Sequence, residues 1–394
     1  MIPAFYEFRS ATKILSGDGA IEHIPFELAN LGVTRPLVIT DKRIRELGLT
    51  QVVLDALADS TLEPAVVFDD VPVDSSVEVA NNVARLFKER GCDGIVAVGG
   101  GSVLDTAKGA AIVLATGAAD LMDFRGSEVL SNVPIPPLVA VPTTAGTGSE
   151  VTGAAVIKDT ERDVKMAFVS FDLQPHVAVL DPRMTVGLPP RITASTAMDA
   201  LVHSVEAASC RQRNPLSDAY AYSAIDLIRE NIYAVLGDGR DKRARLAMAN
   251  AALMAGIAFS NSMVGVVHAI GHACGGVAHV AHGDAMAILL PHCMDFNLDV
   301  CGDAYGELLL PLAGADVYAA TALSARPAAA VAAVRALLAV CADRGGLPLH
   351  LGDVGVSESQ IADIARVALD DGSVSMNPKD VSLDDAVAIL RAAL

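Results

Sequence analysis

Histidine and aspartate side chains recur at helical spacing in the second half of the 394-residue chain, and four of the nine histidines fall within residues 268–282. The set comprises Asp199 and His203, His268 and His272, and His279 and His282. Residues four positions apart share one face of a helix, so such a pair can bind one ligand. A single histidine in an apolar helix is more often a core residue, but burying several without partners costs about 2 kcal/mol or more for each. An aspartate with two or three imidazoles favours divalent iron, zinc or manganese over calcium or magnesium.

Two segments rich in glycine and hydroxyl side chains follow apolar stretches in the first half of the chain. Gly99-Gly-Gly-Ser102 comes after residues 94–98, and Pro142-Thr-Thr-Ala-Gly-Thr-Gly-Ser-Glu150 comes after residues 138–142. Glycine lets the backbone approach a ligand, and a following helix offers free N–H groups to a phosphate. One such segment is more often a tight turn. Two of them, each closing a strand, favour a site for pyrophosphate or ribose, although neither matches the G-x-G-x-x-G pattern.

Asp41 closes the first predicted strand, residues 35–41. A carboxylate at this position can accept hydrogen bonds from a ribose diol and repels a 2′-phosphate, which favours NAD over NADP. The alternative is a cap for the following helix, and Lys42 and Arg43 beside it can tolerate a phosphate.

The pattern of apolar residues changes near residues 183–192. Before this point, apolar runs typical of buried strands (35–41, 65–68, 94–98, 138–142) alternate with helical stretches such as 76–91, which indicates a parallel sheet with crossover helices. After it, helical periodicity dominates over 197–209, 216–235, 243–259 and 328–342, the last beginning directly after Pro327. We expect an α/β domain with a parallel Rossmann-like sheet over residues 1–185 and an all-α domain over residues 186–394.

Composition excludes several classes of protein. The formal charge is −18 and 52% of residues are apolar, which argues against disorder and against a broad face for nucleic acid or anionic lipid. Six scattered cysteines indicate reduced thiols, and no signal peptide is evident, so we expect a cytoplasmic protein. Residues 246–283 lack charged side chains, but their histidines and asparagines predict buried core near a site rather than a membrane span.

Taken in order, these motifs resemble the iron-containing (group III) alcohol dehydrogenase family, which has the dehydroquinate synthase-like fold. The resemblance rests on Gly99–Ser102 with Asp105 and Lys108, the segment 142–150, Asp181-Pro182, Asp199-x3-His203-x2-Glu206, and His268-x3-His272-x9-His282-Gly283. It covers nearly the whole chain. It implies that Asp199, His203, His268 and His282 bind the metal, and that His272 lies against the nicotinamide and relays protons. The implied cofactor contacts are Asp41, Gly99, Gly100, Gly101, Ser102, Thr143, Thr144, Thr147, Thr152 and Lys165, and the implied substrate wall is Ala154, Phe259 and Val264.

The activity implied by this resemblance is reversible hydride transfer between NAD and a primary or small secondary alcohol or diol, giving an aldehyde or ketone. The expected metal is Fe²⁺, with Zn²⁺ and Mn²⁺ as alternatives, and the expected assembly is a homodimer or higher homo-oligomer. Other interpretations are a reductase of maleylacetate or hydroxyacid-oxoacid type, a dehydroquinate synthase-like lyase, and a nucleotide-binding scaffold without turnover. The intact Asp/His set disfavours the metal-free maleylacetate type, and the scarcity of Lys and Arg around it disfavours the lyase.

Two positions fall outside the family pattern. His279 matches no family ligand, which indicates a structural role or a role behind the ligands. Where the family commonly has a Pro-Asn-Pro-Thr-like turn, this chain has Pro72-Val-Asp-Ser-Ser76. Because the second proline is missing, we expect this turn to be less rigid.

Overall fold

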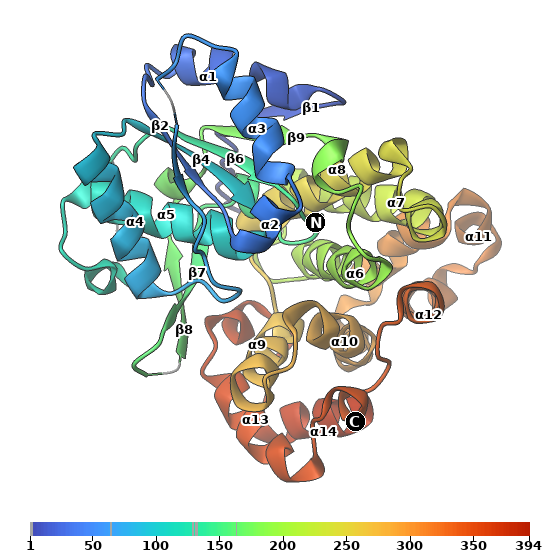
Figure 1. The fold of residues 1–394 in the computed structure, drawn as a ribbon. Helices are drawn as coiled ribbons and strands as arrows, with labels where there is room; N and C mark the ends of the chain where they lie inside the picture. Colours follow the sequence, from blue (N-terminus) through green and yellow to red (C-terminus); the bar gives the residue numbers. More distant parts are fainter. Residues whose placement is uncertain (1–2, 64, 128–129, 131–132, 163) are drawn as a thin grey trace. The chain divides into compact units, whose positions relative to one another are not determined.

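The computed structural model of the chain describes residues 3–63, 65–127, 130, 133–162 and 164–394. These residues form two compact units, each described here by itself (Figure 1). One unit spans Arg9–Gly187, and the other comprises Leu188–Leu394 with the N-terminal residues up to Phe8. Phe8 belongs with the second unit because its ring stacks on Tyr220, with the ring centroids 6.0 Å apart.

The first unit is built on a six-stranded parallel sheet in the order β1-β9-β6-β4-β2-β3. Its strands are β1 (Lys13–Ser16), β2 (Pro36–Ile39), β3 (Val66–Phe68), β4 (Gly94–Gly99), β6 (Leu138–Pro142) and β9 (Val177–Leu180). Alternate residues of β4 enter different cores, Ile95 and Ala97 on one face of the sheet and Val96 and Val98 on the other. A parallel sheet needs such cover on both faces, which explains why β2, β4, β6 and β9 are apolar and buried along their whole length, whereas β1 at the edge is largely exposed.

Five helices accompany this sheet: α1 (Ile24–Asn30), α2 (Lys42–Glu46), α3 (Leu49–Ala58), α4 (Val77–Arg90) and α5 (Gly101–Thr116). Helix α4 has the expected bounds because the Ser76 hydroxyl caps its start and Gly91 ends it in the left-handed conformation, with φ 62°. Helix α5 follows β4 directly. A Cβ atom on Gly99 would lie 2.5 Å from the Val103 side chain, so this passage requires glycine.

A second, three-stranded sheet was not expected from the sequence. It contains β5 (Gly126–Ser127), β8 (Val164–Val169) and β7 (Ala154–Asp159) in that order, with β7 and β8 antiparallel. Lys158 and Asp159 end one strand and Lys165 lies in the other, so the apolar run that indicates a buried strand is interrupted.

The second unit is helical and contains α6 (Pro190–Ala207), α7 (Pro215–Gly237), α8 (Lys242–Ser260), α9 (Val266–Ala278), α10 (His282–Ala313), α11 (Ala315–Ala320), α12 (Arg326–Gly345), α13 (Ile361–Leu369) and α14 (Leu383–Ala393). The expected fold class, a parallel α/β unit and an all-α unit, is confirmed. Helix α12 begins before Pro327 rather than after it. Proline is tolerated in a first turn because the N–H group that it lacks has no helical partner there.

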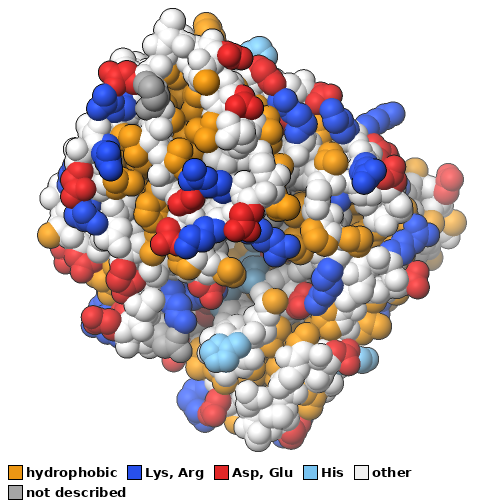
Figure 2. Space-filling model, viewed as in Figure 1, with side chains coloured by type: hydrophobic (Ala, Val, Ile, Leu, Met, Phe, Trp, Pro, Cys, Tyr) orange, Lys and Arg blue, Asp and Glu red, His pale blue; other side chains and the backbone are white. Residues whose placement is uncertain are grey.

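One span of the described residues, Leu323–Gly345, is long and apolar enough to cross a membrane by length and composition. Its helix α12 packs against α10 and α6, as a core helix of a globular unit does. On the face shown in Figure 2, basic and acidic side chains are interspersed, and neither sign forms a continuous area.

Candidate metal centre and nucleotide site

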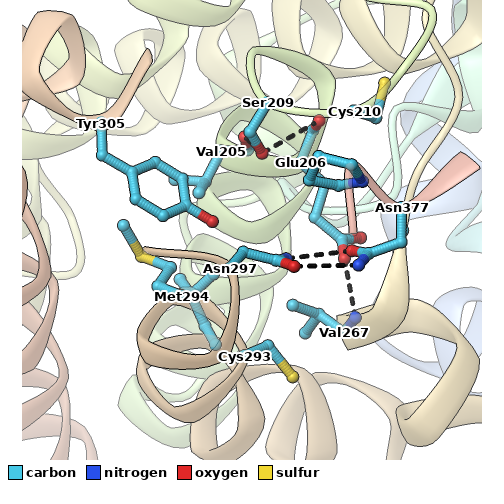
Figure 3. A pocket seen from close by; sticks show the side chains of 13 residues that line it. Val205, Glu206, Ser209, Cys210, Val267, Cys293, Met294, Asn297, Tyr305 and Asn377 are labelled. Atoms are coloured by element: carbon cyan, nitrogen blue, oxygen red, sulfur yellow. Dashed lines mark hydrogen bonds between the residues drawn. The ribbon is translucent and has the colours of Figure 1, made fainter. Parts of the chain in front are cut away.

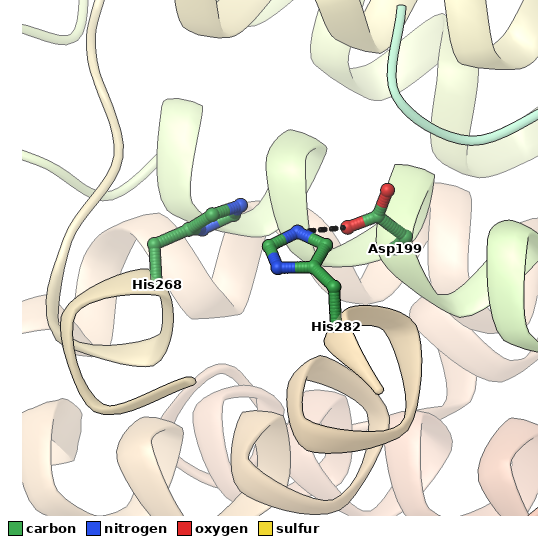
Figure 4. Close-up of side chains that lie close together, drawn as sticks. All are labelled: Asp199, His268 and His282. Carbon is green, nitrogen blue, oxygen red and sulfur yellow. Dashed lines mark ion pairs between the residues drawn. The ribbon is translucent and has the colours of Figure 1, made fainter. Parts of the chain in front are cut away.

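Three helices of the second unit bring the predicted metal ligands together. Asp199 and His203 lie on α6, His268 lies in the first turn of α9, and His282 is the first residue of α10. Asp199, His268 and His282 point toward one another (Figure 4), and one ligand atom from each lies within 4.8 Å of the others. Asp199 Oδ1 is 3.3 Å from His282 Nε2. Two atoms bound to one zinc-like ion at about 2.1 Å each lie at most about 4.2 Å apart, so the 3.3 Å separation of Asp199 Oδ1 and His282 Nε2 fits a shared cation, and a bound ion would draw His268 closer to the other two side chains.

The start of α10 places His282 close to α6. Helix α9 ends at His279, which adopts the left-handed conformation with φ 56°, and α10 begins three residues later. A Cβ atom on Gly283 would lie 2.3 Å from Ser195 Oγ and 2.9 Å from the Ser195 carbonyl oxygen on α6. Glycine at position 283 therefore lets the backbones of α6 and α10 come into contact close to Asp199 and His282. His279 itself is exposed and terminates a helix.

Among the described residues, three buried side-chain atoms of the predicted ligands form no hydrogen bond of normal geometry: Asp199 Oδ1, whose contact with His282 Nε2 is an ion pair at 3.3 Å, His203 Nδ1 and His268 Nε2. Such atoms are rare in folded proteins because each loses its hydration without compensation. Burial lowers the pKa of His203 to about 3 and that of His268 well below its usual range, so both imidazoles are neutral. Burial opposes ionisation of Asp199, yet the surrounding histidines hold its pKa below the usual range. A carboxylate with neutral imidazoles is the donor set that a divalent iron or zinc ion requires, so these residues fit the expected metal.

His203 is adjacent to this group but is not one of its three members. Its ring stacks on His268, with centroids 4.7 Å apart, and on Phe259, with centroids 4.3 Å apart. Phe259, an expected substrate-wall residue, therefore borders the metal centre from α8. Val264, the second such residue of this unit, is half-buried in the segment that leads into α9.

Glu206, one turn beyond His203 on α6, orients His268. Its Oε2 atom lies 2.5 Å from His268 Nδ1, and its Oε1 atom accepts a 2.7 Å hydrogen bond from the Val267 N–H. Burial raises the pKa of Glu206 to about 7. A carboxylate behind an imidazole fixes the ring and directs its other nitrogen toward the metal. The sequence placed Glu206 in a motif but assigned it no role.

His272 lies one turn after His268 and is partly exposed, with Nδ1 2.8 Å from Asp371 Oδ2. Its ring centroid is 5.5 Å from that of His282 and 5.7 Å from that of His268. Sequence reasoning missed Asp371 because it is 99 residues away, in a region without a recognisable motif.

In the first unit, the two glycine-rich segments lie side by side. Strands β4 and β6 are neighbours with Gly99 opposite Pro142, and the Thr143 N–H donates to the Gly99 carbonyl oxygen at 3.0 Å. A Cβ atom on Gly101 would lie 3.1 Å from the Thr147 side chain, and one on Gly100 would lie 3.5 Å from that of Thr144. Both segments follow the carboxyl ends of parallel strands, where nucleotides bind in such sheets. Thr143 Oγ1 is buried without a partner.

Thr152 and Ala154 instead bind a buried lysine of α5. Lys108 Nζ donates to Thr152 Oγ1 at 2.9 Å, to Ser149 Oγ at 2.9 Å and to the Ala154 carbonyl oxygen at 2.7 Å. Asp105, one turn earlier, accepts from Ser149 Oγ at 2.8 Å and from the Val156 N–H at 3.0 Å. Burial lowers the pKa of Lys108 to about 8. This pair fixes the end of the second glycine-rich segment to α5.

Asp41 caps α2, as the alternative interpretation allowed, with Oδ1 accepting from the Ile44 N–H at 2.8 Å. Both roles are compatible, because a carboxylate accepts several hydrogen bonds. Lys42, which could have met a 2′-phosphate, pairs with Asp70 at 2.6 Å, and Arg45 pairs with Asp69 at 2.5 Å.

The turn Pro72–Ser76 is hydrogen-bonded to neighbouring elements, and the expectation that it is less rigid stays a prediction. Its contacts are Ser102 Oγ donating to the Val73 carbonyl oxygen, Lys165 Nζ to Asp74 Oδ1 at 2.7 Å, Ser75 Oγ with Thr106 Oγ1 at 2.8 Å, and the Lys158 N–H to the Ser75 carbonyl oxygen at 2.8 Å. The turn is thus hydrogen-bonded to α5, β7 and β8. Lys165 and Ser102, both expected cofactor contacts, have their side chains engaged with this turn.

Together these features define a nucleotide-type α/β unit and a helical unit with an Asp/His centre in which Asp199 and His268 are buried and His282 is exposed. The family model described as "Iron-containing alcohol dehydrogenase" matches residues 11–182, and that of the "Fe-containing alcohol dehydrogenase family, C-terminal" matches residues 193–394. The chain belongs to the iron-containing alcohol dehydrogenase family, which confirms the expected family and enzyme class.

Relatives match the chain over nearly its full length. It is 39% identical to a 1,3-propanediol dehydrogenase of Klebsiella pneumoniae over 380 residues, covering 96% of each chain. It is 35% identical to an NAD-dependent methanol dehydrogenase of Bacillus methanolicus over 378 residues, covering 96% of this chain and 97% of the relative. The crystal structure of a 1,3-propanediol oxidoreductase superposes with a TM-score of 0.93 at 36% identity, covering 99% of this chain and all of the other.

Proposed function

We propose that the chain is an NAD-dependent alcohol dehydrogenase that interconverts a small primary or secondary alcohol, or a diol, with the corresponding aldehyde or ketone. Asp199, His203, His268 and His282 hold Fe²⁺, and Zn²⁺ or Mn²⁺ suits the same donors. The observation that carries this proposal is the buried His268 Nε2 atom, which has no hydrogen-bond partner among the described residues, beside the ion pair of Asp199 Oδ1 and His282 Nε2 at 3.3 Å. Alcohol and diol substrates of the relatives support the substrate class.

A divalent cation held by these residues supplies Lewis-acid stabilisation of the negative charge that develops on the alcohol oxygen. The single carboxylate of Asp199 would offset only part of the cation's charge, because a histidine that binds a metal does so as neutral imidazole. Phe259 and Val264 border the site with apolar surface that excludes water from the alcohol. His272, with Nδ1 held by Asp371, has its Nε2 atom available to take up the released proton and pass it to solvent.

The nicotinamide of NAD accepts the hydride, and this chemistry belongs to the cofactor. The chain's part is to bind it: backbone N–H groups at Gly99–Ser102 with the start of α5 suit a pyrophosphate, and the hydroxyls of Thr143, Thr144 and Thr147 add donors. Asp41 accepts from the adenosine ribose. Thr152 and Lys165 support this site through Lys108 and Asp74.

The remaining expectations concern location and assembly. We propose a cytoplasmic enzyme, because all six cysteines are free and buried. We also propose a homodimer or higher homo-oligomer, which light scattering after size-exclusion chromatography tests directly.

The test is turnover of anaerobically prepared protein loaded with Fe²⁺. A panel of linear alcohols, 1,2- and 1,3-diols and hydroxy acids is assayed with NAD and with NADP by the absorbance of the reduced cofactor. We expect activity with alcohols or diols and NAD, lost on chelation and restored by the metal. Loaded protein that binds NAD yet turns over no alcohol, or prefers hydroxy acids, contradicts the proposal.

A further inference from the structure

One C-terminal loop contacts α9 and α10, which carry predicted metal ligands, and the segment that follows α6, the third helix with such ligands. This loop, Asp371–Lys379, contains the short 3-10 helix η9 (Gly372–Met376) and precedes α14. It packs against α9 along its length and reaches α10 and the end of α6. The role proposed for this loop rests in part on the proposed function, because one of its contacts is with His272, the proposed proton acceptor.

Asn377 is the buried centre of the loop, with 1% of its surface exposed. Its side chain forms a reciprocal amide pair with Asn297 of α10, at 3.0 Å and 2.9 Å (Figure 3). Its Oδ1 atom also accepts from the Val266 N–H, the first residue of α9, at 3.3 Å. Asn377 thus joins α10 to the free N-terminal N–H groups of the helix that carries His268.

Glu206 accepts the next N–H group of the same turn, that of Val267, as Figure 3 shows. Gly265, just before the helix, is enclosed by these two acceptors. A Cβ atom there would lie 3.0 Å from Asn377 Oδ1 and 3.2 Å from Glu206 Oε1. The first turn of α9 is therefore held between a side chain of the loop and a side chain of α6. Behind Glu206, a cavity of about 10 Å³ lined by Asn297, Asn377 and Tyr305 has room for about one water molecule.

The flanks of the loop are anchored separately. The Met376 carbonyl oxygen accepts from the Arg211 N–H, just beyond α6, at 2.9 Å. Lys379 Nζ binds Asp299 at 2.9 Å and the Phe296 carbonyl oxygen at 3.2 Å, both on α10. These bonds fix the position of Asn377 relative to α6 and α10.

Asp371, at the other end of the loop, faces the second turn of α9. Its Oδ1 atom accepts from the Ser373 N–H at 2.8 Å, and its Oδ2 atom lies 2.8 Å from His272 Nδ1. Asp371 is ionised, so neither of its oxygens has a proton to donate and Oδ2 can only accept from His272 Nδ1. This arrangement places the His272 proton on Nδ1 and leaves Nε2 as an acceptor.

We propose that the loop Asp371–Lys379 is a positioning element of the active site. Asn377 sets the first turn of α9, so that His268 presents Nε2 to the metal, and Asp371 fixes the ring and tautomer of His272. Neither residue touches the metal or the substrate; each acts through a histidine of α9.

The first arm of the test measures metal affinity, which needs no turnover. Asn377→Ala is expected to weaken Fe²⁺ or Zn²⁺ binding, titrated against a competing chelator, by roughly 10- to 100-fold, as is typical when groups behind a ligand are removed. The matched control is Asn231→Ala on α7, whose amide binds only the Leu227 carbonyl oxygen of its own helix at 2.8 Å. The control is expected to bind metal like the parent protein.

If Asn377→Ala does not fold, Asn297→Ala takes its place. This change removes the α10 partner and leaves the bond from Val266 to Asn377 in place, so a smaller loss of metal affinity is expected. Metal affinity within twofold of the parent protein in a folded variant of either residue overturns the role of Asn377.

The second arm separates a tautomer effect from a structural one at Asp371. In Asp371→Asn, the amide oxygen keeps the Ser373 N–H, so the NH₂ group faces His272 Nδ1 and imposes the opposite tautomer. We expect kcat to fall at least tenfold in Asp371→Asn, as far as in Asp371→Ala, with KM and metal affinity changed less than threefold. Asp363→Asn, which removes an exposed carboxylate paired with Arg366 on α13, is the matched control and is expected to retain the parent kcat.

If the role of Asp371 is purely structural, the isosteric Asp371→Asn variant keeps nearly the parent kcat. That result overturns the role proposed for Asp371. The proposed function and the positioning role of the loop can be contradicted separately. If the parent protein oxidises no alcohol, the proposed function fails, whereas the metal-affinity result for Asn377 still stands or falls independently.

Discussion

The two buried polar clusters of this protein differ in how their hydrogen bonds are satisfied. Around Lys108 in the α/β unit, all three ammonium N–H donors have acceptors within 2.9 Å. Around Asp199 in the helical unit, three buried atoms among the described residues form no hydrogen bond of normal geometry. A cluster that is complete by itself supports the framework, whereas an incomplete one indicates a ligand that completes it. The Lys108 cluster therefore supports the structure around a site, whereas the Asp199 cluster is expected to bind the ligand itself.

The largest expected effect tests the incomplete cluster. His268→Ala removes a ligand atom, so turnover is expected to fall by more than about a thousandfold, with loss of bound metal and a retained circular dichroism spectrum. Metal analysis and single-turnover assays measure both quantities. His176→Ala, in the first unit, is a control outside the metal centre. A His268→Ala enzyme with metal and near-normal turnover removes His268 from the account.

The comparison also predicts opposite stability effects in metal-free protein. Lys108→Met leaves Asp105 without its compensating charge and removes the 2.7 Å hydrogen bond to the Ala154 carbonyl oxygen, so the free energy of unfolding is expected to fall by about 3 kcal/mol. Asp199→Asn removes a buried charge whose Oδ1 atom has only the 3.3 Å contact with the partly exposed His282, so it is expected to change stability by less than about 1 kcal/mol or to raise it. Urea denaturation of the two variants measures this. Equal destabilisation by Lys108→Met and Asp199→Asn would contradict the difference in hydrogen bonding between the two clusters.

Glu150, in the second glycine-rich segment, is expected to make the free energy of unfolding depend on pH. Burial raises its pKa from 4.5 to about 7. Between these values the folded state holds a proton that the unfolded state has released, so this contribution to stability declines as pH rises through that window. Glu150→Gln is expected to remove the decline and stabilise the protein at about pH 8 by on the order of 1 to 3 kcal/mol. Exposed Glu161→Gln is the control, and equal pH slopes for Glu150→Gln and the parent protein contradict the assignment.

The smallest expected effect concerns cofactor choice at Asp41. Because this residue caps α2, Asp41→Ser keeps a capping oxygen while it removes the charge. The ratio of kcat/KM for NAD over NADP is expected to fall roughly tenfold, which corresponds to about 1.4 kcal/mol of differential binding. Steady-state kinetics with both cofactors measure it. An unchanged ratio would leave Asp41 as a helix cap alone.

Local patterns in the sequence predict much of this molecule because they reflect short-range geometry. The spacing of Asp199 and His203 places both on one face of α6, and Ser76 and Gly91 bound α4 through the caps that they form. Apolar runs buried on both faces identified four strands of the parallel sheet, β2, β3, β4 and β6.

The partners of these residues were not predictable in the same way. Glu206 and His268 are 62 residues apart and His272 and Asp371 are 99 apart, and only the packing of helices brings them together. Lys108 similarly finds its acceptors across 41 to 46 residues. The alternation of apolar and polar residues does not predict such pairs, because a buried imidazole or ammonium group can form a hydrogen bond with many different side chains.

The most direct test of the account is anomalous diffraction at the metal absorption edge from crystals of anaerobically prepared protein. The account predicts one ion per chain bound by Asp199 Oδ1, His268 Nε2, His282 and His203, with bonds of about 2.0 to 2.3 Å. An ion at a different set of residues, or no ion and an Asp199–His282 pair closed by a direct hydrogen bond in metal-supplemented protein, would contradict it.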